Sequence, residues 1–213
     1  MNTHETATTT DPSLDITNVD LSSLEVNFDN TEIAFSNKSN GKLRKQYFLF
    51  AVMNNPTLVS IGTKLVKWGF SWHLPIKGLI KHTIFEQFCG GENIDDCEKT
   101  IQQLARQNVG TILDYSVEGA ENEENFDHTV EEILATIQKS ATSKHIPFCV
   151  FKVTGLATVD LLTKIQSKSP LSPAEEEAFT RVKKRVDTIC RCAYEKKVRI
   201  FIDAEETWIQ EVI

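Results

Sequence analysis

PFCVFKVTGL, residues 147–156, is an apolar run that breaks off at a lysine, and the chain contains two more runs of this kind. They are TILDYSVEG, residues 111–119, and RIFIDAEETW, residues 199–208. Runs of five or six apolar residues rich in β-branched and aromatic types are typical of strands buried on both faces, as in a parallel sheet. Helical patterns lie between the runs, so the sequence predicts a parallel α/β fold with right-handed crossovers.

Charged residues follow each predicted strand at the same relative point. The carboxyl ends of parallel strands are where α/β folds place their chemistry. We therefore expect a functional rim, built from strands that are far apart in the sequence. Its candidate residues are Asp114 and Glu118 on the first strand, Lys152 on the second, and Asp203, Glu205 and Glu206 on the third.

Lys152 is the sharpest single candidate. It follows the buried run 148–151, so desolvation of its ammonium group lowers its pKa unless carboxylates on the flanking strands compensate. The residue can act as a Schiff-base lysine, or as a charge that positions a cofactor or a substrate. It can equally be a lysine that reaches solvent where its strand ends.

The acidic candidates also have two readings each. Asp114 and Glu118 share a parity along the strand, so they face the same side if the strand continues, and one of them can be buried against the lysine. Glu118 can also be a solvated loop residue. Asp203 ends a buried strand, whereas Glu205 and Glu206 are explained either by a cluster that pairs with cations or binds a metal, or by favourable charge at the start of a helix.

Composition limits the classes of partner and compartment. The formal net charge of −7 argues against an electrostatic nucleic-acid binder. Histidines and cysteines lack the spacing of a zinc site, and no GxGxxG or Walker A loop is present. The five cysteines fit reduced thiols, and the amino terminus has no basic or apolar signal region. We expect a cytoplasmic protein without a metal or a nucleic-acid partner.

The chain divides into three predicted parts. Residues 1–23 are polar and predict a disordered tail, residues 24–91 a helical arm, and residues 92–213 the α/β part. Within the arm, residues 57–73 place three aromatic side chains beside basic ones. This pattern fits either an interfacial membrane helix or an amphipathic helix that packs on its own protein.

Two helix starts can be predicted from local sequence. Ser172, Pro173 and Glu175 form the pattern of a capping box with proline at the first helical position. Asp127 is the capping candidate for the helix between the first two strands.

Four segments taken in order resemble the proline dehydrogenase family. They are the F-x-G pattern at 88–91, LDYSVEG, FKVTGL and IDAEETWIQ, and the likeness runs from about Lys42 to the last residue. The family resemblance implies a (β/α)8 barrel that binds FAD at the carboxyl ends of its strands. It implies oxidation of L-proline to Δ1-pyrroline-5-carboxylate, with electrons passed to a membrane quinone. It also implies a mitochondrial enzyme if the source is eukaryotic, and possible peripheral contact with a membrane.

The resemblance gives roles to individual residues. Lys152 is similar to the family lysine beside the flavin and the substrate, and Asp203 to the active-site aspartate of the third strand; both are then cofactor-binding and catalytic. Glu118 is similar to the glutamate of the first strand that pairs with a substrate-binding arginine. Asp114 and Glu205 are neighbours on the substrate rim.

The resemblance covers only part of a barrel. Its first three strands, preceded by the helical arm, are present, and we expect residues 92–213 to be a barrel truncated at its carboxyl end. The arginine pair that clamps the proline carboxylate, and most groups that hold FAD, belong to later strands. We therefore expect the 213-residue chain alone to be inactive. Two other hypotheses stay open: a Schiff-base aldolase using Lys152, and a non-catalytic barrel module that recruits another chain at its sheet edge.

Overall fold

The computed structural model describes residues 29–115 and 122–213 and divides the chain into two compact units, residues 1–45 and 46–213. In the first unit the described residues form helix α1 (Thr31–Ala34) and the start of α2 (Asn40–Met53). The predicted tail, residues 1–23, lies outside the described residues, and so does Glu118.

The helices of the arm follow one another with short breaks. Asn55 caps α3 (Pro56–Ser71), because its side chain accepts hydrogen bonds from two backbone N–H groups of the first turn. The sequence predicts a further helix over 75–83. In the structure α4 (Lys77–Ile80) continues through a π-helical turn (Lys81–Phe85) into α5 (Glu86–Phe88). Among the described residues, no helix has the length and apolar character to cross a membrane.

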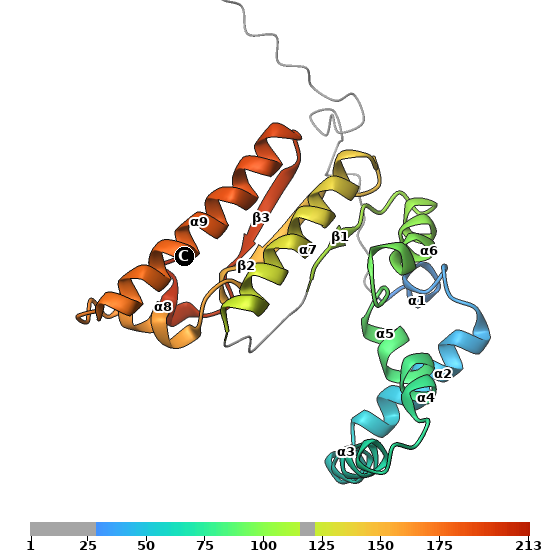
Figure 1. Ribbon diagram of the computed structural model, residues 1–213. Coiled ribbons are helices and arrows are strands. Elements are labelled where there is room, and N and C mark those ends of the chain that lie inside the picture. The colour runs from blue at the N-terminus through green and yellow to red at the C-terminus, as the bar shows by residue number, and fades with distance from the viewer. Residues whose placement is uncertain (1–28, 116–121) are drawn as a thin grey trace, which may run out of the picture. The chain divides into compact units, whose positions relative to one another are not determined.

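The remaining elements alternate between helix and strand, in the order that the sequence predicts (Figure 1). They are α6 (Ile94–Ala105), β1 (Ile112–Leu113), α7 (Glu123–Ala141), β2 (Phe148–Lys152), the 3₁₀ turn η5 (Val153–Gly155), α8 (Val159–Gln166), α9 (Pro173–Glu195), β3 (Arg199–Asp203) and the 3₁₀ turn η6 (Thr207–Ile209).

The three strands form a parallel sheet in the order β1-β2-β3. Ile112 pairs with Phe148, and Phe148 pairs with Arg199, so the strands advance across the sheet in sequence order. Two crossovers of the same hand that step in the same direction leave their helices on the same face. Figure 1 shows α7 and α9 side by side against the sheet, and both helices contact it.

Only one face of the sheet is covered by these helices. Leu113, Cys149 and Phe151 point to this face and are buried. On the opposite face, Ile112 is 43% exposed and Phe201 is 47% exposed. The expectation of strands buried on both faces is therefore wrong for the described residues, because both helical crossovers lie on the same side.

Helix capping shows where local sequence was sufficient. Ser172 accepts a hydrogen bond from the backbone of Glu175, whose carboxylate accepts one from the backbone of Ser172. The predicted capping box is confirmed. Asp127 is not a cap: α7 begins earlier, where the side chain of Asn122 accepts a hydrogen bond from the backbone N–H of Asn125.

Candidate active site

Three of the predicted rim residues lie at the carboxyl end of the sheet, on its open face. Lys152 ends β2 and stands in register with Asp203, which ends β3. Asp114 follows β1 directly and has the parity of the open-face residue Ile112. Glu205 lies two residues beyond β3, in the connection to η6.

The carboxylates of these residues surround the Lys152 ammonium group. Its Nζ donates a hydrogen bond to Glu205 Oε1 at 2.5 Å. Asp203 Oδ2 lies 3.7 Å from the same nitrogen, and Asp114 Oδ2 lies 4.0 Å away. The lysine side chain is only 11% exposed, whereas the three carboxylate side chains are 37–44% exposed. The cation is thus the enclosed partner, and its counter-charges face solvent.

The pKa of Lys152 is raised above its ordinary value. The hydrogen bond to Glu205 is the main cause, and the charges of Asp114, Glu205 and Asp203 add to it. Desolvation acts in the opposite direction but is outweighed. The alternative given by the sequence, a lysine whose burial is compensated by carboxylates, is the one that the structure supports.

Among the described residues, one ammonium group faces three carboxylates, so this part of the cluster carries more negative than positive charge. The excess of negative charge suits a further cation, such as the ammonium group of a substrate. Glu206 is half-buried and directly precedes η6, which is a turn of only three residues. Stabilisation of Glu205 and Glu206 by charge at the start of a helix therefore applies only to a very short element. The described residues contain no group of three or more His, Cys, Asp or Glu side chains placed to hold a metal.

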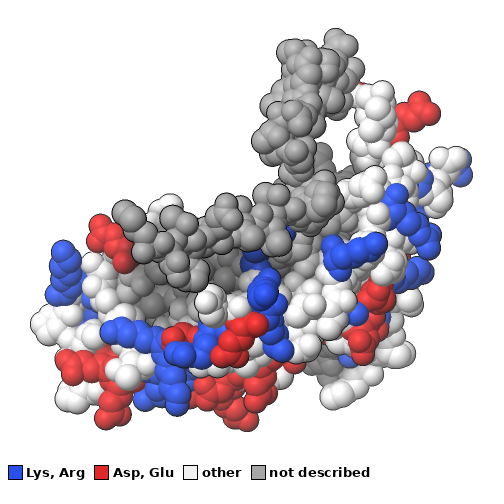
Figure 2. Space-filling model, turned by 90° about the horizontal axis from the view of Figure 1, so that it is seen from above, with Lys and Arg blue, Asp and Glu red and all other residues white. Residues whose placement is uncertain are grey.

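Other charged side chains are paired more simply. Lys139 contacts Glu98, Lys164 contacts Glu175, and similar pairs occur along the helices. On the face drawn in Figure 2, blue and red side chains lie next to one another over much of the surface. A cation enclosed by three carboxylates differs from this pattern, which makes the rim the candidate site.

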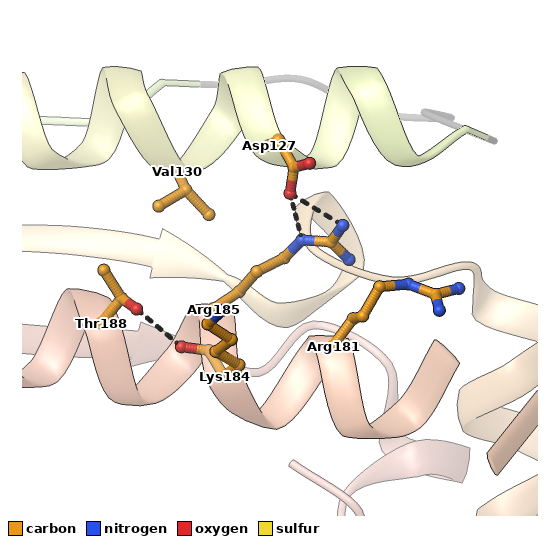
Figure 3. A pocket seen from close by; sticks show the side chains of 6 residues that line it. All are labelled: Asp127, Val130, Arg181, Lys184, Arg185 and Thr188. Atoms are coloured by element: carbon orange, nitrogen blue, oxygen red, sulfur yellow. Dashed lines mark hydrogen bonds and ion pairs between the residues drawn. The ribbon is translucent and has the colours of Figure 1, made fainter. Parts of the chain in front are cut away.

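Sequence reasoning missed one charged residue near the rim, Arg185. It is 6% exposed and lies on the face of α9 that carries Val182 and Ile189, both buried. The signal was present: an arginine three residues after one core position and four before the next lies within an apolar stripe. One of the partners of Arg185 on α7 is Asp127, the residue that the sequence assigned to a helix cap (Figure 3).

Comparison of the sequence with protein families identifies the family to which the chain belongs. The sequence model described as proline dehydrogenase matches residues 97–213, which is more than half of the chain. This chain belongs to the proline dehydrogenase family. The match covers all three strands and the whole Lys152 cluster.

Individual relatives agree with the family match. The chain is 31% identical over 126 residues to the carbapenem antibiotics biosynthesis protein CarD of Pectobacterium carotovorum, covering 59% of this chain and 34% of that protein. It is 30% identical over 176 residues to the mitochondrial proline dehydrogenase 1 of Dictyostelium discoideum, covering 65% and 31%, respectively. Identity to the Arabidopsis thaliana enzyme of the same name is 24%, covering 65% and 35%. The chain spans about a third of the length of these curated relatives.

Proposed function

We propose that this chain contributes the first three strands of a (β/α)8 barrel that oxidises L-proline to Δ1-pyrroline-5-carboxylate with FAD. The observation that carries the proposal is the Lys152 cluster, which lies at the carboxyl ends of three parallel strands within the segment that matches the family. This is the edge at which a barrel of this class holds its reacting groups.

The open face of the sheet supports the proposed substrate. Oxidation at the carbon next to an amine needs the amine to be held and its proton accepted, and the carboxylates of Asp203 and Glu205 are suited to both tasks. Lys152 contacts both carboxylates and holds them in place. Asp114 completes the cluster from β1. The proposed role of Glu118 in pairing with a substrate-binding arginine falls on a residue outside the described ranges.

The described residues fit part of FAD. At the carboxyl edge, the open face offers FAD the ammonium donor of Lys152, while the stacked rings of Phe148 and Phe201, with centroids 4.6 Å apart, lie further toward the amino ends of the strands. Bound FAD would accept the hydride that leaves the carbon next to the amine. Lys152 and Asp203 would then lie at the flavin, where a fixed cation stabilises developing negative charge.

The proposal can be tested in a grafted enzyme. Residues 97–213 would replace the matching segment of the Dictyostelium enzyme, followed by measurement of flavin absorbance and of proline-dependent dye reduction. We expect a yellow protein that reduces the dye when proline is added. A folded, flavin-loaded graft that does not reduce the dye when proline is added would contradict the proposal.

For the 213-residue chain by itself we propose neither tight FAD binding nor turnover. Bidentate recognition of a carboxylate needs arginine near the rim. Arg199, at the amino end of β3, instead places its guanidinium over the ring of Phe148, 4.3 Å from the centroid. Flavin absorbance of the purified chain, with and without added FAD, checks this statement.

The electron acceptor and the membrane belong to the same proposal. We propose that a membrane quinone takes up the electrons and that the protein is otherwise cytoplasmic, or mitochondrial in a eukaryote. The arm supports a peripheral contact: Trp68 and Trp72 are 53% and 66% exposed, and residues 46–85 carry four lysines and no acidic residue. Sedimentation with anionic and with neutral vesicles would test it, since only the anionic vesicles should retain the protein.

The Schiff-base alternative is disfavoured by the state of Lys152. Imine formation needs an unprotonated amine, whereas the surrounding carboxylates raise the pKa of this lysine. Borohydride trapping with a carbonyl substrate would show a covalent adduct if this alternative were correct.

A further inference from the structure

The buried arginine on α9 is connected to three separate groups. Arg185 Nε donates to Asp127 Oδ1 at 2.8 Å, Nη2 donates to Glu123, and Nη1 donates to the backbone carbonyl of Leu156 at 3.2 Å. Figure 3 shows Arg185 reaching from α9 toward Asp127 on α7. A single side chain therefore joins two helices and the connection that follows β2.

The cluster is balanced in charge. Arg181, one turn before Arg185, donates to both carboxylate oxygens of Glu123, each at 2.9 Å. Two guanidinium groups thus share the carboxylates of Glu123 and Asp127, and each of the three nitrogens of the Arg185 guanidinium donates a hydrogen bond. A hollow of about 290 Å³ adjoins the cluster. Because the arginine charges are matched, we assign the cluster a mechanical role and no anion-binding role.

The carbonyl that Arg185 holds is close in sequence to Lys152. The single 3₁₀ turn η5 separates Lys152 from Leu156. Val153, Leu156 and Ala157 are 6%, 0% and 2% exposed, so this connection is packed along its length. A displacement at Leu156 is therefore transmitted to the end of β2, since close-packed segments have little free volume to absorb it.

The far side of the same connection supports Glu205. Helix α8 starts after Ala157, and the Gln166 side chain near its end accepts hydrogen bonds from the backbone N–H groups of Glu211 and Val212, just after η6. Glu205 lies two residues before the start of η6. The connection after β2 thus contributes to the position of both partners in the shortest contact of the rim, which is the 2.5 Å hydrogen bond between Lys152 and Glu205.

We propose that Arg185 is a positioning residue for the rim. By holding the Leu156 carbonyl against α7 and α9, it fixes Lys152 at its distances from Asp114, Asp203 and Glu205. The importance of Arg185 for catalysis rests on the proposed function, whereas its effect on Lys152 can be measured without any turnover.

The test compares two neighbouring arginines in the 213-residue chain. Arg185→Lys keeps the positive charge but removes the forked donors, so the Leu156 carbonyl loses its partner. Arg181→Met is the matched control, because Arg181 binds Glu123 from the same helix but does not contact Leu156. Urea unfolding followed by circular dichroism establishes that each variant is folded.

Two readouts report on position. In hydrogen exchange, we expect the peptide covering 153–158 to exchange about 10-fold faster in Arg185→Lys and within about 2-fold of the parent in Arg181→Met. The ε-methylene NMR signal of Lys152, assigned with a Lys152→Arg variant, gives the pKa directly. This pKa should fall in Arg185→Lys, because the carboxylates no longer surround the amine. It should not change in Arg181→Met.

The outcomes separate this proposal from the proposed function. A folded Arg185→Lys variant with unchanged exchange over 153–158 and an unchanged Lys152 pKa would overturn it. If that variant does not fold, Asp127→Ala, which removes an exposed partner of the Arg185 Nε, gives the same readouts at smaller amplitude and decides in the same way. If the Lys152 pKa falls in Arg185→Lys but the grafted enzyme does not oxidise proline, the positioning role is supported. Only the proposed function is then overturned.

Discussion

The two faces of the three-stranded sheet are built from alternate residues of the same strands, yet they differ in burial and in the charged groups that they present. On the covered face, Cys149 and Phe151 are 0% and 1% exposed under α7 and α9. On the open face, Phe201 is 47% exposed, and the strands end in an ammonium group among carboxylates. Along β2, period-two alternation therefore separates the buried core residues from the residue that ends in the rim.

The clusters of charge on the two sides differ in the same way. On the covered side, Arg185 donates from each of its three guanidinium nitrogens, and Arg181 and Arg185 together are balanced by the carboxylates of Glu123 and Asp127. On the open side, Lys152 leaves an excess of negative charge at the edge where a ligand can approach. A balanced cluster holds structure together, whereas an unbalanced one has charge left for binding.

The largest expected effect is on stability, and it tests the difference in burial between the two faces. Phe151→Ala should cost about 3–5 kcal/mol of unfolding free energy, because it leaves a cavity in the packed face. Phe201→Ala should cost about 1 kcal/mol or less, since its ring is half exposed and loses mainly the stacking contact with Phe148. Urea unfolding measures both. Equal losses would mean that the open face is covered in solution.

The second effect concerns chemistry on the open face. In the grafted enzyme, Lys152→Met should lower kcat for proline about 10²- to 10³-fold, the range found when a fixed charge-stabilising donor is removed. Lys164→Met is the control, because Lys164 pairs, among the described residues, with Glu175 on the helical side. Steady-state dye reduction with matched flavin content checks the result, and equal activity of the two variants would remove Lys152 from the mechanism.

A smaller effect concerns folding stability in acid, and it comes from the charged cluster on the covered side. The guanidinium of Arg181, assisted by Arg185, lowers the pKa of Glu123 from its ordinary 4.5 to about 2. A carboxyl whose pKa is lowered by folding stabilises the protein above its unfolded pKa, and this contribution is lost as the pH falls from about 5 to 2. Because nearly half of the Glu123 side chain is exposed, we expect about 1 kcal/mol.

Glu123→Gln provides the measurement of the acid effect. Urea unfolding at several pH values should show a shallower loss of stability below pH 5 in this variant than in the parent. Parallel curves for the two proteins would show that the Arg181–Glu123 pair contributes nothing at equilibrium.

The smallest effect concerns folding stability in alkali, and it comes from Lys152 on the open side. The pKa of Lys152 is raised by its carboxylate partners, so its contribution to stability is complete below the ordinary lysine value and is lost as the pH rises through the folded-state pKa. Lys152→Met should therefore differ from the parent in stability at neutral pH and converge with it in strong alkali. A difference that is constant with pH would assign the effect to packing.

Local sequence predicted the elements that local forces decide. The Ser172 capping box and the positions of β2 and β3 needed no knowledge of distant residues. Among the described residues of the first apolar run, only Ile112 and Leu113 pair with β2, so the strand is shorter there than the run suggests. The length of a strand depends on its partner, which a run of apolar residues does not reveal.

The candidate site could be predicted as a set of residues but not as a set of contacts. Strand-end charges indicated Lys152, Asp114, Asp203 and Glu205, since parallel strands bring their carboxyl ends to one edge. The sign of the Lys152 pKa shift depended on distances of a few ångströms, which no sequence pattern contains. The Arg185 network was missed because its partners lie on another helix and on a backbone carbonyl.

The register of the parallel sheet also has a consequence for folding kinetics. Phe148 pairs with Arg199, and all of α8 and α9 lies between these partners in the chain. Pairing of residues so distant in sequence requires closure of a long loop before any contact repays it, which makes such sheets slow to form. Helices α7 and α9, with their capped starts and local ion pairs, are formed by nearby contacts. We therefore expect the rim around Lys152, which needs all three strands, to be assembled last in this domain.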